Sequence, residues 1–219
     1  MLQTHRDPHY IDRFTIYGER HCGTNFLEAC VKEQFGLDVT YRFGWKHFFG
    51  FTKPEVIMYN RQILFIGIVR NPYDWIMANI KLKHHIPPEN RASTIDFLTK
   101  EWYSIDNWTK REIMQDRNYI TKERYKNIFE LRKYKIIYLS QYMPMYAANY
   151  VLMSYDSFVR NHINFLNIIG EKFRLKTVAK PPEVRINNYY PIPQDIKKII
   201  DTNIDWEIEA SVGYFKQDL

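Results

Sequence analysis

The feature of this sequence that most constrains its fold is a run of seven apolar residues, Ile-Leu-Phe-Ile-Gly-Ile-Val, at positions 63–69. A strand with one solvated face alternates apolar and polar residues, whereas a strand buried on both faces is apolar throughout. The run therefore predicts a central strand of a parallel sheet with helices on both sides. It is far too short to span a bilayer.

Strand-like and helix-like patterns alternate along the rest of the chain. This alternation predicts an α/β fold of three layers, α/β/α, with a central parallel sheet, and a single domain over residues 1–219. The further strands are expected at 13–17, 39–45 and 150–154. Helices are expected at 24–35, from about Asp74, at 94–108, at 121–139, at 155–170, and from Pro193, with the last helix ending at Gly213.

The prediction of a helix at 94–108 rests on the resemblance of Ser93–Asp96 to a capping box and on a stripe of apolar residues. The stripe has three- and four-residue steps, which predicts that its side chains face the core. Its members are Ile95, Leu98, Trp102, Ile105 and Trp108.

The composition favours anionic partners. The 31 Lys and Arg residues exceed the 25 Asp and Glu residues, which gives a net charge of +6. Nucleotides, sulfated sugars and nucleic acid are all anionic, and the charge alone does not choose among them, but no tract rich in Lys and Arg indicates a nucleic-acid-binding arm. Two cysteines, a polar N-terminus and the lack of a long apolar run predict a cytoplasmic protein that neither enters a membrane nor uses a disulfide framework.

The loop Gly18-Glu19-Arg20-His21-Cys22-Gly23 lies between a predicted strand and a predicted helix. Glycines at its two ends let backbone amides approach an anion, and the helix N-terminus adds a favourable dipole. The arrangement is that of a phosphate-binding loop, and it makes the expected fold P-loop-like.

A nucleoside-triphosphate loop would continue with Lys and then Ser or Thr, but this chain has Thr24 and Asn25 there. The Lys that grips the outer phosphates and the hydroxyl that holds Mg²⁺ are both missing. This difference favours metal-free transfer of a less charged group, such as a sulfuryl group. Two alternatives stay open: a divergent kinase, and a P-loop-like nucleotide-binding module without turnover.

Two segments resemble the sulfotransferases that use 3′-phosphoadenosine 5′-phosphosulfate. Arg20-His21-Cys22-Gly23-Thr24-Asn25-Phe26 resembles their 5′-phosphosulfate loop, and Val69-Arg70-Asn71-Pro72 with Asp74 resembles their 3′-phosphate segment. The run Tyr155–Phe158 is similar to a later segment of the same family. With these segments, the resemblance covers the chain from about Tyr17 to Phe158.

The resemblance implies that this nucleotide sulfate is the donor and that no metal is needed. It also implies that Arg70 binds the 3′-phosphate, where Ala78 replaces the second, serine ligand of the family. The residues implied for the 5′-phosphosulfate are Arg20, His21, Cys22, Gly23, Thr24 and Asn25, with Phe26 stacking near the adenine or packing in the core.

Trp45-Lys46-His47 lies where such enzymes carry catalytic residues. Imidazole titrates near neutral pH, so His47 is the expected general base, and Lys46 is expected to stabilise developing charge. If one strand ran through both residues, only one side chain could face the site. By family analogy the acceptor is a carbohydrate hydroxyl or amine, with a small alcohol or phenol as the alternative, and 83–91 and 176–193 are candidate pocket walls.

Overall fold

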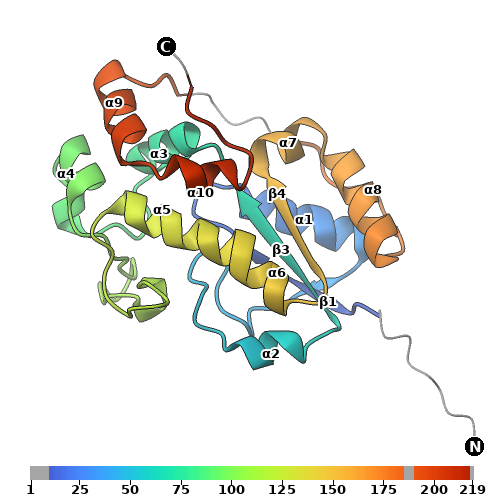
Figure 1. Ribbon diagram of the computed structural model, residues 1–219. Helices are drawn as coiled ribbons and strands as arrows, with labels where there is room; N and C mark the ends of the chain where they lie inside the picture. The colour runs from blue at the N-terminus through green and yellow to red at the C-terminus, as the bar shows by residue number, and fades with distance from the viewer. Residues whose placement is uncertain (1–9, 185–189, 218–219) are drawn as a thin grey trace, which may run out of the picture.

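Within the described residues, 10–184 and 190–217, the computed structural model has a sheet of four parallel strands in the order β2-β1-β3-β4 (Figure 1). The strands are β1 Arg13–Tyr17, β2 Asp38–Val39, β3 Ile63–Val69 and β4 Tyr150–Ser154. β3 lies inside the sheet between β1 and β4, and all seven of its residues are buried. The predicted central strand is confirmed, as is the α/β class.

Helices cover both faces of the sheet, which makes the three predicted layers. Leu64 and Ile66 of β3 point into one apolar cluster, and Phe65 and Val69 point into the other. The first face packs against α1 (Thr24–Phe35) and α8 (His162–Phe173). The second packs against the end of α5 (Ile128–Ile137), a π-helix η3 (Tyr138–Tyr142) and α6 (Met143–Tyr146), which form one long rod in Figure 1.

Shorter helices connect these layers. They are α2 Pro54–Met58, α3 Pro72–Lys81, η1 Pro88–Arg91, α4 Thr94–Thr99, η2 Met114–Asp116, α7 Tyr155–Arg160, α9 Gln194–Asn203 and α10 Trp206–Ala210. The side chain of Asn71 caps α3, so this helix begins two residues before Asp74. Of the described helices, none combines the length and the apolar character that crossing a membrane requires.

The strand expected at 39–45 is wrong beyond its first residue. β2 ends at Val39, and one more backbone bond, from Thr40 N to Phe14 O at 2.8 Å, prolongs the pairing with β1. The chain then turns, because the amide of Gly44 donates to Tyr41 O and Gly44 has a φ of 110°. As a result, the residues after Gly44 lie in a turn and outside the sheet.

The prediction of a helix over 94–108 is also wrong after Thr99, where α4 ends. Ser93 caps α4 as predicted, but Trp102 then exchanges two backbone hydrogen bonds with Tyr125 (2.7 and 3.0 Å). Extended pairing of this kind takes over the backbone groups that a longer helix would need. Ile95 is 50% exposed and Trp108 is 92% exposed, so the predicted core-facing stripe fails at its first and last members.

The helix expected to begin at Thr121 begins at Ile128 instead. Asn127 caps it by accepting from the amides of Phe129 and Glu130. The preceding residues form turns around Asn118, whose side chain accepts from the amides of Ile120 and Thr121. Asparagine is a strong N-cap, and here it outweighs the helical pattern upstream.

Candidate anion-binding and transfer site

The loop after β1 has the geometry of an anion-binding cradle. Gly23 is the N-cap of α1 and has a φ of 77°, and no side chain caps the helix. The first amides of a helix have no intrahelical partner, and together with the helix dipole they favour an anion. Gly23, Thr24, Asn25 and Phe26 line a cavity at this point.

Both ends of the loop require glycine, because neighbouring atoms leave no space for a Cβ atom there. A Cβ atom at Gly18 would lie 2.6 Å from Ile68 Cγ2 and 2.8 Å from its carbonyl oxygen. At Gly23 it would lie 2.5 Å from Cε2 of Tyr155, the first residue of α7. The loop is therefore pressed against β3 at one end and against α7 at the other.

His47 is held as a neutral base. Its Nδ1 lies 2.7 Å from the carbonyl oxygen of Gly18. A carbonyl can only accept, so Nδ1 carries the proton and Nε2 keeps its lone pair. Burial lowers the pKa of His47 to about 3, with smaller contributions from Arg20 and Lys46. The ring is thus uncharged near neutral pH.

Lys46 and His47 both line the cavity because they lie in a tight turn instead of a strand. The amide of Phe48 donates to Trp45 O at 2.9 Å, which closes the turn. The Lys46 ammonium donates to the side chain of Asn25 and forms an ion pair with Glu28 at 3.4 Å. The lysine is thereby fixed at the N-terminus of α1.

Arg70 closes the other side of the cavity. Its Nη1 donates to His21 O at 3.0 Å, and its guanidinium lies 4.8 Å from the ring centre of Tyr155. The side chain is buried, and Nε has no hydrogen-bond partner. The guanidinium borders the cavity, and its planar fork of N–H groups is suited to a phosphate.

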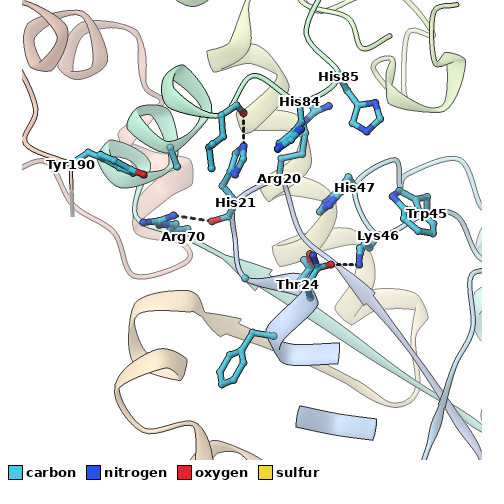
Figure 2. A pocket seen from close by; sticks show the side chains of 15 residues that line it. Arg20, His21, Thr24, Trp45, Lys46, His47, Arg70, His84, His85 and Tyr190 are labelled. Atoms are coloured by element: carbon cyan, nitrogen blue, oxygen red, sulfur yellow. Dashed lines mark hydrogen bonds between the residues drawn. The ribbon is translucent and has the colours of Figure 1, made fainter. Parts of the chain in front are cut away.

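His21 contributes no positive charge to the cradle. Its Nε2 donates to Leu82 O at 2.9 Å, so Nδ1 is the acceptor. Burial lowers the pKa of His21 to about 4, helped by Arg20, His84 and Arg70. The ring lines the cavity as a neutral group (Figure 2).

Arg20 borders the cavity, but its charge is directed into the protein. Its Nη1 donates to Ser104 Oγ at 2.7 Å, and its Nη2 pairs with Asp116 at 3.2 Å. The side chain is 3% exposed. Most of its charge is therefore balanced by buried acids.

Two further loop residues differ in their placement. The side chain of Cys22 is buried behind the loop, and burial raises the pKa of its thiol to about 12. Phe26 lines the cavity and also packs against Phe158 (5.6 Å between ring centres) and His162 (5.5 Å). Its ring belongs both to the helix packing and to the cavity wall.

These groups meet at one cavity of about 580 Å³. Figure 2 shows Lys46 and His47 on one side, with Arg70 and Tyr190 on the other. The remaining lining comes from Arg20, His21, Gly23, Thr24, Asn25, Phe26, Trp45, Ala78, Leu82, His84 and His85. Ligand cavities of about 300–1,000 Å³ are usual for small molecules.

The two candidate pocket walls each contribute to this cavity. His84 and His85 come from the first, and Tyr190 comes from the second, of which residues 185–189 lie outside the described part. No local motif in the sequence marks these three residues. In the part of the chain that the structure describes, there is no group of three or more His, Cys, Asp or Glu side chains that could hold a metal ion.

Comparison with known proteins supports the architecture. No family model matches the chain, and no curated protein matches its sequence. Among solved structures, the chain is similar to a sulfotransferase from Alicyclobacillus acidocaldarius, with 11% identity, a TM-score of 0.56, and coverage of 95% of this chain and 97% of that one. At this identity the likeness shows the fold, which is the P-loop-like three-layer α/β/α fold of a sulfotransferase.

Proposed function

We propose that this chain is a sulfotransferase that moves a sulfuryl group from 3′-phosphoadenosine 5′-phosphosulfate to an acceptor hydroxyl or amine. The observation that carries the proposal is the convergence on one cavity of an uncapped helix N-terminus, the arginine Arg70, and a neutral histidine base. The fold shared with a solved sulfotransferase supports the same reading.

The donor has two anionic ends, and two groups of N–H donors at the cavity would bind them. The amides that open α1 would bind the 5′-phosphosulfate. Arg70 would bind the 3′-phosphate through its fork of N–H groups. Phe26, which also lines the cavity, would offer an aromatic face to the adenine.

In the transfer, the acceptor oxygen attacks sulfur as the bond from sulfur to the donor's phosphate oxygen breaks. Nε2 of His47 takes the acceptor proton, because Nδ1 is already committed to Gly18 O. Lys46 lies beside the helix N-terminus and stabilises the negative charge that gathers on the leaving phosphate. The anionic donor raises the pKa of His47 and so strengthens it as a base.

The aromatic rim favours a carbohydrate acceptor. Trp45 lines the cavity, is 43% exposed, and packs at 4.6 Å from the ring centre of Tyr41. Exposed aromatic surface at a ligand cavity is suited to an amphipathic ring such as a sugar. An acceptor screen with sugars, small alcohols and phenols tests this part separately.

The first experiment is calorimetric titration with 3′-phosphoadenosine 5′-phosphate in the absence of metal. Wild type is expected to bind it, and Arg70→Ala is expected to lose about 10- to 100-fold in affinity through lost charge-assisted hydrogen bonds. Arg13→Ala is the matched control, because Arg13 is exposed and lies at the opposite end of β1. No binding, or preference for ATP with Mg²⁺, would contradict the proposal and favour the divergent kinase.

Turnover separates an enzyme from a nucleotide-binding module. Release of 3′-phosphoadenosine 5′-phosphate from the donor is measured with each acceptor, for wild type and for His47→Ala. An enzyme is expected to lose turnover in the variant while the product still binds. Binding without turnover on any acceptor would favour the module.

A further inference from the structure

Four charged side chains are buried together at the loop of residues 18–23, which we call the anion loop. They are Glu19, Arg20, Asp116 and Lys135, and none is more than 6% exposed. Two are acidic and two are basic, so the cluster as a whole is neutral. It joins the loop after β1, the short helix η2 and the rod-forming helix α5.

Asp116 is the member that connects the others. Its Oδ2 accepts from Arg20 Nη2 at 3.2 Å and from Ser104 Oγ at 2.5 Å. Its Oδ1 pairs with Lys135 Nζ at 2.9 Å. The carboxylate is fully buried, and the two cations hold its pKa below the ordinary value despite that burial.

Lys135 connects Asp116 to the turn at 45–48, which contains His47. Its Nζ donates to the carbonyl oxygens of His47 and Phe49, each at 3.2 Å, and lies 4.4 Å from the Phe49 ring centre. One carboxylate thus holds the anion loop through Arg20 and the backbone of His47 through Lys135. His47 and the loop also meet directly at the bond from Nδ1 to Gly18 O.

We propose that Asp116 is a positioning residue that holds His47 against the anion loop, so that Nε2 faces the donor. The role rests on the proposed function, since it matters to chemistry only if His47 is the base. Asp116 itself touches neither donor nor acceptor, because it lies behind Arg20 and does not line the cavity.

The physical cost of the cluster supports a role beyond stability. Burying an ion costs several kcal/mol, and apolar residues of similar volume often stabilise a fold equally well or better. Here Asp116 and Lys135 connect the two pieces of chain whose separation would decide transfer, the loop that carries Arg20 and the turn that carries His47. Placement errors of about 1 Å can cost about 100-fold in rate.

The test reads the ring of His47 directly and requires neither donor nor acceptor. In ¹H–¹⁵N spectra, wild type is expected to show a protected Nδ1–H signal, assigned by its loss in His47→Asn. Asp116→Asn and Lys135→Met are expected to lose this signal or to show exchanging tautomers. Asp116→Glu, which keeps the charge but moves the carboxylate, is a third variant in case either of these does not fold.

Asn149→Ala is the matched control for lost stability. Asn149 is buried, and its side chain donates to Arg61 O at the start of β3, remote from the cluster. It is expected to lower the unfolding temperature and to leave the His47 signal unchanged. An unchanged signal in the folded Asp116 and Lys135 variants would overturn the positioning role.

A binding measurement separates this proposal from the proposed function. If wild type fails to bind 3′-phosphoadenosine 5′-phosphate, the proposed function fails whatever the spectra show. If it binds and turns over, Asp116→Asn is expected to lower kcat at least tenfold and affinity less than threefold. Equal effects in the His47→Ala background and in wild type would show that Asp116 does not act through His47, and would also overturn the role.

Discussion

The ring of Tyr155 packs so closely on Gly23 that a Cβ atom at Gly23 would lie 2.5 Å from Cε2 of the ring. The centre of the same ring lies 4.8 Å from the guanidinium of Arg70, which lines the cavity. One aromatic side chain therefore sets the position of both the helix N-terminus and the arginine that would bind the two ends of the donor.

Gly23→Ala tests this packing. Alanine would be strained at a φ of 77°, which costs about 1–3 kcal/mol, and it would also displace Tyr155. The free energy of unfolding is therefore expected to fall by more than the strain alone. Gly213→Ala is the matched control, because Gly213 has a φ of 84° with nothing within 4 Å of its added Cβ. Urea unfolding measures both, and equal losses would mean that the ring yields without cost.

Restoring a hydroxyl at position 78 is expected to tighten the 3′-phosphate site. Ala78 is buried on the cavity wall where the resembling family carries serine. A new hydrogen bond to an anion in Ala78→Ser would raise the affinity for 3′-phosphoadenosine 5′-phosphate about tenfold. Adenosine 5′-phosphate lacks the 3′-phosphate and should gain nothing in calorimetry. An equal gain for both nucleotides would place Ala78 away from the 3′-phosphate.

The buried histidines predict that the protein loses stability in mild acid. Burial lowers the pKa of His47 to about 3 and of His21 to about 4, against an ordinary value of 6.5. Below pH ~6.5 the unfolded state then binds more protons than the native state, so the free energy of unfolding falls as pH decreases toward ~4. His21→Gln with His47→Asn keeps both hydrogen-bond donors and removes both titrations.

The comparison of wild type and this double variant isolates the histidine contribution. Burial raises the pKa of Glu19 to about 6, which acts in the opposite direction between its ordinary value of 4.5 and 6, but Glu19 is present in both proteins. Urea unfolding at several pH values should show a weaker pH dependence in the variant below pH ~6.5. Parallel curves would mean that the two rings titrate normally in the native state.

Breaking the buried pair of Arg132 and Glu209 is expected to destabilise the fold strongly. Arg132 binds both carboxylate oxygens of Glu209, and Nη2 also donates to Arg70 O at 2.8 Å. Arg132→Met leaves an unpaired buried charge and should cost about 3–5 kcal/mol in guanidinium unfolding. Adding Glu209→Leu should recover most of that loss. A double variant as unstable as the single one would mean that the bond to Arg70 O dominates.

The parts of the fold that could be predicted are those with a local cause. β1, β3, β4 and α1 have the predicted bounds, because each has a complete apolar pattern or ends at a glycine. The helix over 94–108 could not be excluded from its spacing, because the competing partner of Trp102 is Tyr125, which lies 23 residues further along the chain. Apolar spacing indicates which side chains will be buried. It does not indicate which distant segment will form backbone hydrogen bonds with the segment that carries them.

In the candidate site, too, residues with a local motif could be predicted, and contacts between distant residues could not. Arg70, Lys46 and His47 were predicted from short motifs, and the structure brings all three to one cavity, while their roles stay predictions. The inward pairing of Arg20 with Asp116 has no such signal, since the two residues are 96 positions apart. The buried partners of Arg20 could therefore not be predicted from the loop sequence, and its role in donor binding stays a prediction.

The position of Asp116 also has a consequence for the order in which the molecule assembles. β3 and β4 are neighbours in the sheet, yet η2 and α5 both belong to the long connection between them. Closing so long a loop is slow and entropically unfavourable, so the pairing of β1 with β3 can precede it. Until η2 and α5 dock, Arg20 lacks its bond to Asp116, and Glu19 lacks the nearby charge of Lys135. We therefore expect the anion loop to be among the last regions to become rigid, although it lies near the beginning of the chain.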